Sequence, residues 1–217
     1  KEWFEQADYL SKYVLGKTAD EVAAMPVGED GKSTDADLLA GCTVAVGDYL
    51  SVIAEAARNA TSRGAAAGDT LGLGIVADTQ TNSKAAADGA DGNAEVDVTV
   101  VALTRGADGT ITSAVTDAVQ APLAFTAAGE ASSDTVTLTT KYALGNDYHM
   151  KDASGIGLEW FEQADAFCAF MRGKTIDQVS GAVTDGYATD ADLKAGCTIN
   201  MYGFLGAAAK ADANAQA

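Results

Sequence analysis

Two motifs occur twice in this sequence, and their repetition constrains the fold more than any other feature. Residues 1–22 read KEWFEQADYLSKYVLGKTADEV, and residues 158–179 read LEWFEQADAFCAFMRGKTIDQV. Further along, TDADLLAGCT at 34–43 returns as TDADLKAGCT at 189–198. Because repeated segments of this length indicate a repeated structural unit, we expect both copies to adopt the same local structure.

Only the second copy has a strand-like stretch before it. A Gly-, Thr- and Val-rich region at 70–150 precedes that copy, whereas the first copy begins at Lys1. The economical interpretation is a tandem repeat whose first copy is incomplete. Residues 1–60 form the C-terminal helical half of a first unit, 61–68 form a polar linker, and 69–217 form a complete unit. By this logic, a longer version of the chain would carry another strand region upstream.

Both EWFEQA segments are predicted to be amphipathic helices. Apolar side chains recur at helical spacing, with charged side chains on the opposite side. The apolar positions are Trp3, Phe4, Ala7, Leu10 and Leu15 in the first copy, and Trp160, Phe161, Ala164, Phe167, Phe170 and Met171 in the second. A Trp-Phe pair would suit a stacking platform for an aromatic ligand, but the apolar neighbours favour a stripe that faces the core.

Shorter helices are predicted after each of these segments. Thr18 and Thr175 stand at N-cap positions, and the threonine or the first aspartate of each TDADL motif is expected to cap the next helix. An Ala-rich helix ends each copy, and TVAV at 43–46 fits either a strand leading into that helix or the helix itself. GKT is not part of a phosphate loop, because Ser11 and Cys168 stand where the first glycine of GxxxxGK[ST] is required.

The region before the second copy is predicted to form strands. Four β-branched, partly alternating segments lie there, at 71–81, 94–105, 110–120 and 134–144. RGADGT at 105–110 is typical of a hairpin turn of the Asp-Gly type. We therefore expect an α+β fold: an antiparallel sheet of four or five strands within 70–150, with helices within 155–215 packed on one face.

The charge of the chain restricts its partners. With 31 acidic and 14 basic side chains the formal net charge is −17, which argues against binding to nucleic acid, whose phosphates would be repelled. No run approaches the eighteen or more apolar residues that a membrane span requires, so no transmembrane segment is expected in this chain.

Few residues are suited to catalysis or metal binding. His149 is the one histidine, which argues against histidine-based zinc sites and Ser-His-Asp triads. Cys42, Cys168 and Cys197 have no CxxC spacing and are predicted to be small buried thiols. DGADGNAEVD at 88–97 is rich in oxygen ligands but does not fit the EF-hand pattern, so a solvated turn is expected. We predict neither catalytic nor metal-binding residues.

The order of features in 69–217 matches a known arrangement. Strands carry a D-G-x-I hairpin (Asp108, Gly109, Ile111), and then come a helix, GKT, and Asp-x-x-Ala-Gly-Cys-Thr before a final helix. This order resembles the FMN-binding domain of flavin subunits in bacterial sodium-pumping and related electron-transfer complexes, and of surface flavoproteins of Gram-positive bacteria. The motif of that family is D-x-x-[ST]-G-[AS]-[TS]. The resemblance extends over both copies.

The resemblance implies a set of cofactor-binding residues. In that family the last motif residue is the Thr or Ser to which a separate flavin transferase attaches FMN through a phosphoester. The corresponding residues are the acceptors Thr43 and Thr198, the aspartates Asp37 and Asp192 read by the transferase, and the motif glycines Gly41 and Gly196. Free backbone N–H groups would favour the phosphate there if the final helices begin near Val44 and Ile199.

The same motif also fits a purely structural account. AGCT would then form a buried turn in which the glycine supplies a special backbone angle and the threonine a capping hydroxyl. Under this account the chain binds no flavin. The two accounts therefore predict different cofactors: FMN under the first and none under the second.

The pattern that includes MKDASGIGLEWFEQA at 150–164 is similar to predicted lipoproteins or secreted proteins of gut-dwelling Firmicutes, which implies a location outside the cytoplasm. We expect a non-catalytic cell-surface or secreted domain of FMN-binding type, without flavin and of unknown ligand. The alternative is an electron-transfer flavoprotein that carries FMN covalently on threonine. Because residues 1–60 lack strands of their own, their apolar stripe must cover the sheet, mediate self-association or stay partly exposed.

Overall fold

The computed structural model describes residues 1–132 and 138–215 of the 217-residue chain. The chain separates into two compact units, Lys1–Ser62 and Arg63–Ala217. Each unit has a hydrophobic core of its own. The boundary falls within the linker predicted at 61–68.

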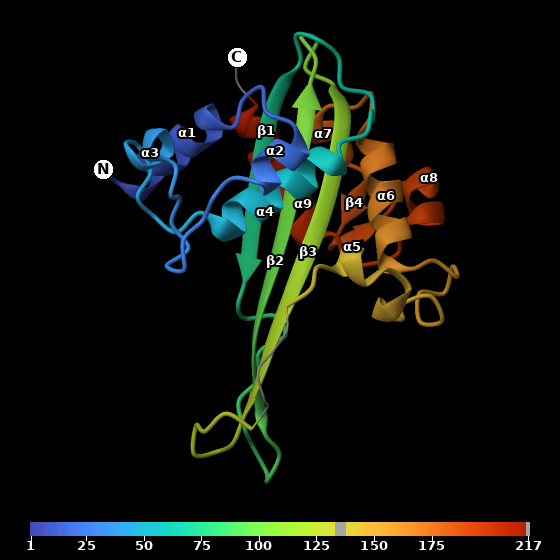
Figure 1. Ribbon diagram of the computed structural model, residues 1–217. Coiled ribbons are helices and arrows are strands. Elements are labelled where there is room, and N and C mark those ends of the chain that lie inside the picture. The colour runs from blue at the N-terminus through green and yellow to red at the C-terminus, as the bar shows by residue number, and fades with distance from the viewer. Residues whose placement is uncertain (133–137, 216–217) are drawn as a thin grey trace. The chain divides into compact units, whose positions relative to one another are not determined.

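The first unit, Lys1–Ser62, is a small helical layer (Figure 1). Its helices are α1 (Trp3–Tyr13), α2 (Ala19–Ala23), α3 (Ala36–Leu39) and α4 (Gly47–Arg58). Its core consists of Leu10, Val22, Leu38, Cys42, Val46, Leu50 and Ala54. Residues 1–62 are all described, and among them two isolated β-bridges are formed but no strand. Residues 43–46 therefore form neither of the two predicted elements, because α4 begins only at Gly47.

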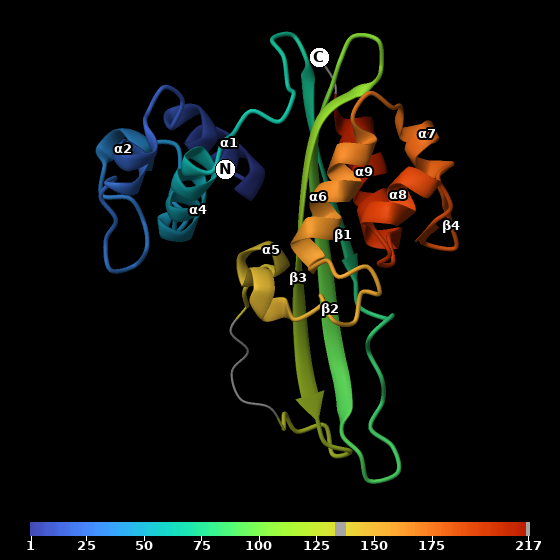
Figure 2. The same ribbon diagram turned by 90° about the vertical axis from the view of Figure 1, so that its right-hand side faces the viewer.

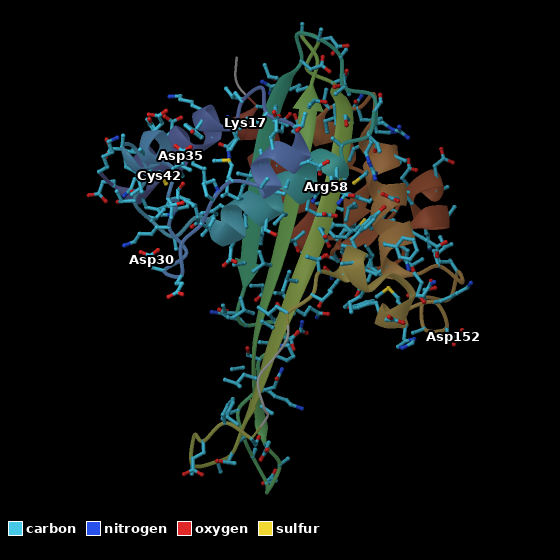
Figure 3. All side chains as sticks on the ribbon, viewed as in Figure 1. Lys17, Asp30, Asp35, Cys42, Arg58 and Asp152 are labelled. Atoms are coloured by element: carbon cyan, nitrogen blue, oxygen red, sulfur yellow. The ribbon has the colours of Figure 1, made fainter. Side chains whose placement is uncertain are left out.

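Asp35 illustrates how a polar side chain fixes a turn in this unit (Figure 3). Its carboxylate accepts hydrogen bonds from the backbone N–H groups of Asp37 (2.9 Å) and Leu38 (3.0 Å), so it is the N-cap of α3. The Tyr13 hydroxyl donates to the same oxygen at 3.0 Å. The Leu38 N–H, followed by the Tyr13 hydroxyl, lowers the pKa of Asp35. In both units the aspartate of TDADL, not the threonine, is the cap.

The second unit is built on a three-stranded antiparallel sheet (Figure 1). Strands β1 (Thr70–Asp78), β2 (Gly92–Arg105) and β3 (Ile111–Phe125) follow one another in the order β1-β2-β3. The predicted hairpin turn joins β2 and β3, where the Gly106 N–H donates to Thr110 O at 2.9 Å. The α+β class and the antiparallel sheet are confirmed.

The predicted number of strands is wrong for the residues that the structure describes. The main sheet has three strands, and a separate hairpin of β4 (Val183–Thr184) and β5 (Tyr187–Ala188) lies among the helices. Of the strand predicted at 134–144, residues 134–137 lie outside the described residues. Its last four residues form helix α5 (Lys141–Leu144), because the Thr140 hydroxyl accepts the Ala143 N–H at 3.2 Å and caps a helical turn.

Helices cover one face of this sheet. After α5 and a 3₁₀ turn, η1 (Gly145–Tyr148), come α6 (Trp160–Met171), α7 (Ile176–Ser180), α8 (Ala191–Gly196) and α9 (Tyr202–Asn214). Helix α9 packs on β1 and β2, and α6 packs on β3. Strands β2 and β3 continue well beyond the ends of these helices (Figure 2). The helices therefore cover only part of this face of the sheet.

Two glycines let α9 approach β1 closely. A Cβ at Gly74 would overlap the carbonyl oxygen of Ala207 and lie 2.6 Å from the Ala211 nitrogen, and Gly72 is similarly placed against Ala211. The backbone of the helix therefore rests directly on the strand. Alternate residues of β1 face the other side of the sheet, where Leu71, Leu73 and Ile75 are exposed.

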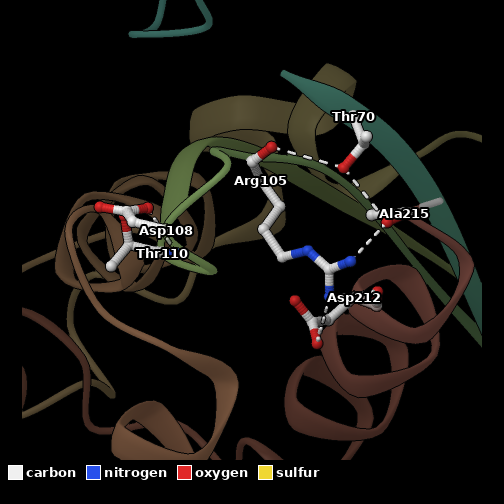
Figure 4. Close-up of polar contacts among 6 residues, drawn as sticks. All are labelled: Thr70, Arg105, Asp108, Thr110, Asp212 and Ala215. Carbon is white, nitrogen blue, oxygen red and sulfur yellow. Dashed lines mark hydrogen bonds and ion pairs between the residues drawn. The ribbon is translucent and has the colours of Figure 1, made fainter. Parts of the chain in front are cut away.

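The C-terminal end of α9 is tied to the sheet by polar contacts (Figure 4). The Arg105 guanidinium donates to Ala215 O at 2.8 Å and lies 3.5 Å from the Asp212 carboxylate. The Thr70 hydroxyl donates to the same Ala215 oxygen at 3.1 Å. These contacts anchor the last turn of α9 between β1 and β2.

The order of helices in the first unit recurs in the second. Helices α1 and α6 both begin with a capping box, and Thr18 and Thr175 cap α2 and α7 in the same way. The expected N-caps at these threonines are confirmed. Burial, however, differs between the units at equivalent positions. Trp160 is 3% exposed beneath the helical layer, whereas Trp3 is 59% exposed.

The prediction of a core-facing Trp-Phe stripe is therefore correct for α6 and wrong for α1. In the second unit Trp160 packs edge-on against Phe204, with ring centroids 5.6 Å apart. In the first unit Trp3 donates its indole N–H to the Tyr49 hydroxyl at 3.1 Å, and both side chains stay exposed. The reason is that Lys1–Ser62 contains no sheet for this face to cover.

Candidate functional site

A buried glutamine holds each motif threonine in place. In the second unit the Gln163 side-chain oxygen accepts hydrogen bonds from the Thr198 backbone N–H (2.9 Å) and hydroxyl (3.2 Å). The Gln163 amide NH₂ donates to Leu158 O at 3.1 Å, and the side chain is fully buried. The Thr198 hydroxyl also lies 3.0 Å from Ser154 O. This amide thus links the start of α6 to the loop before α9.

The first unit repeats the arrangement. Gln6 accepts from the Thr43 backbone N–H at 2.8 Å and from its hydroxyl at 3.1 Å, and donates to Lys1 O at 3.1 Å. The sequence reasoning missed this glutamine. The glutamine could have been identified from its position on the apolar side of α6, between Trp160 and Phe167. A polar side chain placed there is buried, and a buried amide requires hydrogen-bond partners.

The two motif glycines are required for close packing, not for a special backbone angle. Neither Gly41 nor Gly196 has a positive φ. A Cβ at Gly196 would lie 2.8 Å from the Ala166 Cβ on α6, and one at Gly41 would overlap the ring of Tyr9 on α1. The predicted role of the glycine in the turn is therefore wrong, and its role is to let α3 and α8 approach the preceding long helix.

The threonines do not stand at helix N-termini. Helices α4 and α9 begin at Gly47 and Tyr202, so the condition that these helices start near Val44 and Ile199 is not met. The threonine hydroxyls are also not N-caps, since they donate to glutamine instead of accepting backbone N–H groups. Free N–H groups of a helix therefore do not lie next to the threonine, where they would be needed to bind a phosphate.

The motif aspartates lie away from the threonines' hydrogen-bond network. Asp37 and Asp192 occupy the second residue of α3 and α8, and both side chains are exposed. Their backbone N–H groups donate to the capping Asp35 and Asp190, each at 2.9 Å. Because these exposed carboxylates lie in the first turn of their helices, they interact favourably with the helix dipole.

Thr198 lines a cleft in the second unit. The cleft has a volume of about 620 Å³ and lies between the covered face of the sheet, the start of α9 and the β4–β5 hairpin. Its aromatic lining consists of Trp160, Tyr187, Tyr202 and Phe204, and its polar lining includes Thr198, Asp78, Asp97, Thr99, Gln120 and Asn200. The volume lies in the range of small-molecule sites. Neither Asp192 nor Gly196 is part of the lining.

Charged groups of both signs border this cleft. The Lys141 ammonium lies 5.0 Å from the ring centroid of Tyr148 and 5.7 Å from that of Trp160. Hydrogen bonds from the Thr81 hydroxyl and from the backbone N–H groups of Gln80 and Thr81 lower the pKa of Asp78. Asp78 is therefore ionised at neutral pH.

The cysteines confirm the prediction of free, buried thiols. Burial raises the pKa of Cys168 to about 12 and that of Cys197 to about 11. Neither thiol is a nucleophile at neutral pH, because the thiolate is the reactive form. Within residues 1–132 and 138–215 there is no group of three or more His, Cys, Asp or Glu side chains that could hold a metal ion. In the same residues no helix has the length and apolar character of a membrane span.

Comparison of the chain with protein-family models, with curated proteins and with solved structures found no match.

Proposed function

We propose that the chain is a non-catalytic domain of FMN-binding type that holds a small ligand in the cleft beside Thr198. The supporting observation is that the motif threonine lies in the wall of a cleft lined by four aromatic side chains. Such a lining gives a large apolar contact area, and a few polar groups orient the ligand. Under this proposal Thr198 and its supporting Gln163 shape the cleft wall and perform no chemistry.

Under the same proposal the first unit is the incomplete copy of a tandem repeat. Thr43 is exposed and belongs to a unit without a sheet, so it has no cleft of this kind. The exposed face that includes Trp3 and Tyr49 is then the region of 1–60 through which the protein associates with itself. A location outside the cytoplasm, on the cell surface or secreted, is part of the proposal through the resemblance alone.

The second candidate is an electron-transfer flavoprotein with FMN attached to Thr198. It is favoured by the position of the threonine in an aromatic cleft, where the isoalloxazine ring could stack on Trp160 or Tyr202. Attachment would remove the hydroxyl hydrogen that Thr198 donates to Ser154 O and Gln163. This cost is the reason for ranking covalent flavin second.

The test is intact mass together with a visible absorbance spectrum, on protein from its native host or co-expressed with a flavin transferase. A covalent FMN increment that is lost in T198A but retained in T43A would establish the second candidate. Thr43 is a matched control, because its backbone N–H and hydroxyl bind Gln6 as those of Thr198 bind Gln163.

For the first candidate, the same preparations are analysed by native mass spectrometry. The expected result is an unmodified, colourless chain that carries a non-covalent small molecule, released when the cleft is narrowed by Gly203→Leu. A Cβ at Gly203 would already lie 2.7 Å from the Thr99 hydroxyl oxygen. Loss of the molecule in T43A instead, or a folded chain that never carries one, would contradict the proposal.

A further inference from the structure

One face of the sheet in the second unit is apolar and lies opposite the long helices. Helices α6 and α9 pack on the other face, where Gly72 and Gly74 lie against α9. Directly paired residues share a face, and successive residues of a strand lie on opposite faces. The uncovered face, called the open sheet face below, therefore includes these cross-strand rows: Leu73–Ala102–Val115, Ile75–Val100–Asp117 and Ala77–Val98–Val119.

The open sheet face has the size and polarity of an interaction surface. The nine residues of β1 extend for about 30 Å and three strands span about 14 Å, so the face measures about 400 Å² in projection. Asp117 is the one charged residue in the rows, and its Oδ1 accepts hydrogen bonds from the backbone N–H groups of Ala118 and Tyr142. Contiguous apolar patches of this size often mark interaction sites.

The repeat supplies a helical surface of the kind that covers a sheet. By the repeat, Trp3 and Tyr49 correspond to Trp160 and Phe204, which belong to the core between the helices and the sheet of the second unit. The two side chains meet in both units, through a hydrogen bond in the first and a ring contact in the second. Trp3, Tyr49 and the neighbouring Val52 of α4 are nevertheless exposed, and we call this surface the helical face.

Val52 indicates which kind of sheet face the helical face fits. It corresponds to Ala207, whose carbonyl oxygen lies against Gly74 in the second unit. The larger valine side chain prevents such a close approach, so the helical face cannot take the place of α9 on the glycines of β1. It fits a sheet face whose own side chains, such as Leu73, fill the space between helix and strand.

We propose that the helical face of one copy of the chain packs on the open sheet face of a second copy. Each copy has one face of each kind, so reciprocal exchange between two copies leaves neither face unpaired and closes the assembly as a dimer. Two such pairings bury about 1,600 Å² in total, which is the size of a standard stable interface. The inference rests on the self-association within the proposed function, because it names the surface that receives the first unit.

The experiment measures the mass of the full chain in solution by analytical ultracentrifugation over a wide range of protein and salt concentrations. The expected result is a monomer in dilute protein and a dimer as the concentration rises. Added salt should strengthen the dimer, because two copies with a net charge of −17 each repel one another and salt screens this repulsion.

One substitution on each face tests the contact. Val52→Arg and Leu73→Arg should each weaken the dimer at least about tenfold, because each places an unpaired charge in an apolar interface. Both side chains are exposed, so the unfolding temperature should remain that of the parent. Leu15→Arg is the control of equal charge and should leave the dimer unchanged. Leu15 is exposed in the first unit, and the repeat places Arg172 at the corresponding position of the second.

A mixture of the two variants distinguishes this contact from a symmetric one. Val52→Arg retains its open sheet face and Leu73→Arg retains its helical face, so the mixture should form a dimer more tightly than either variant alone. Recovery in the mixture also shows that both variants are folded. If sheet faces paired with each other instead, Val52→Arg alone would remain dimeric, and the inference would be overturned.

Two further results would overturn the inference. If the chain dimerises equally well in both variants, self-association stands but uses other surfaces. If the chain is monomeric at every protein and salt concentration, the inference and the self-association fail together. Protection of Trp3 from quenching in such a monomer would indicate that the first unit binds within its own chain. The ligand cleft is tested separately by mass spectrometry, so its outcome depends on neither result.

Discussion

At the scale of single residues, the buried amide of Gln163 joins two segments that are 35 residues apart in the sequence. We predict that Gln163→Leu lowers the free energy of unfolding of the second unit by about 1–3 kcal/mol, because the partly buried Thr198 N–H loses its acceptor. Urea denaturation measures the change through tryptophan fluorescence in a Trp3→Phe background, in which Trp160 is the one remaining tryptophan. A stability equal to that of the parent would show that the amide does not hold this loop.

Gln6→Leu is the matched control in the first unit. Because Gln6 makes the same bonds to Thr43, the substitution should destabilise Lys1–Ser62 and leave the Trp160 transition unchanged. If Gln6→Leu shifted the unfolding transition of the second unit, the Gln6–Thr43 and Gln163–Thr198 hydrogen bonds would not be independent.

Residue roles were predictable from the sequence where they depend on neighbours in the chain. Thr18 and Thr175 cap their helices as expected, since a cap needs only the next three residues. The role of Gly196 was not predictable, because it depends on Ala166 of another helix. Gln163 could have been recognised as a buried amide from its position on the helix, but its partner could not.

At the scale of elements, α9 lies on β1 without intervening side chains. We predict that Gly74→Ala destabilises the second unit by about 1–3 kcal/mol, because the added methyl would overlap the Ala207 carbonyl and force the helix away from the strand. Gly181→Ala in the same unit is the control. Its φ is −66°, and its nearest contact would be an ordinary 3.4 Å, so a change within about 0.5 kcal/mol is expected. Equal effects in urea denaturation would contradict the close-approach account.

Elements with a clear period were predicted and short ones were not. Helix α6 and strands β1 to β3 follow their patterns, because burial on one face imposes the period. Helix α1 also forms as predicted, although Trp3 and Phe4 of its apolar stripe are exposed. The β-branched residues before α5 suggested a strand continuing to Leu144, yet the cap formed by Thr140 decides the structure there. The cleft could not be predicted, because its lining comes from segments far apart in the sequence, from Val76 on β1 to Phe204 on α9.

At the scale of the whole molecule, the two cores contain no residue in common. We predict that Arg63–Ala217 without the first 62 residues folds with the same free energy of unfolding as in the full chain, within about 0.5 kcal/mol. Urea denaturation of both chains, with Trp3→Phe in the full chain so that Trp160 alone fluoresces in each, measures this. A loss of more than about 1 kcal/mol would show that the first unit stabilises the second.

The exposure of Trp3 in the first unit can be tested by fluorescence quenching. Trp3 should be quenched readily by acrylamide in dilute protein, whereas Trp160 should be protected. If the first unit mediates self-association, quenching of Trp3 falls as the protein concentration rises. Constant quenching up to high concentration would contradict association through this face.

The close approach of α9 to β1 also bears on how a ligand enters. Lys210 and Asn214 donate to carbonyl oxygens of β1, so the helix cannot move without breaking backbone contact along the strand. The wall that Tyr202 and Phe204 contribute is therefore preorganised and loses little conformational entropy on binding. Adjustment falls to another part of the lining, the exposed loop with Thr81 and Asn82. Binding of a ligand to this cleft should therefore follow a single kinetic phase, with an observed rate proportional to ligand concentration.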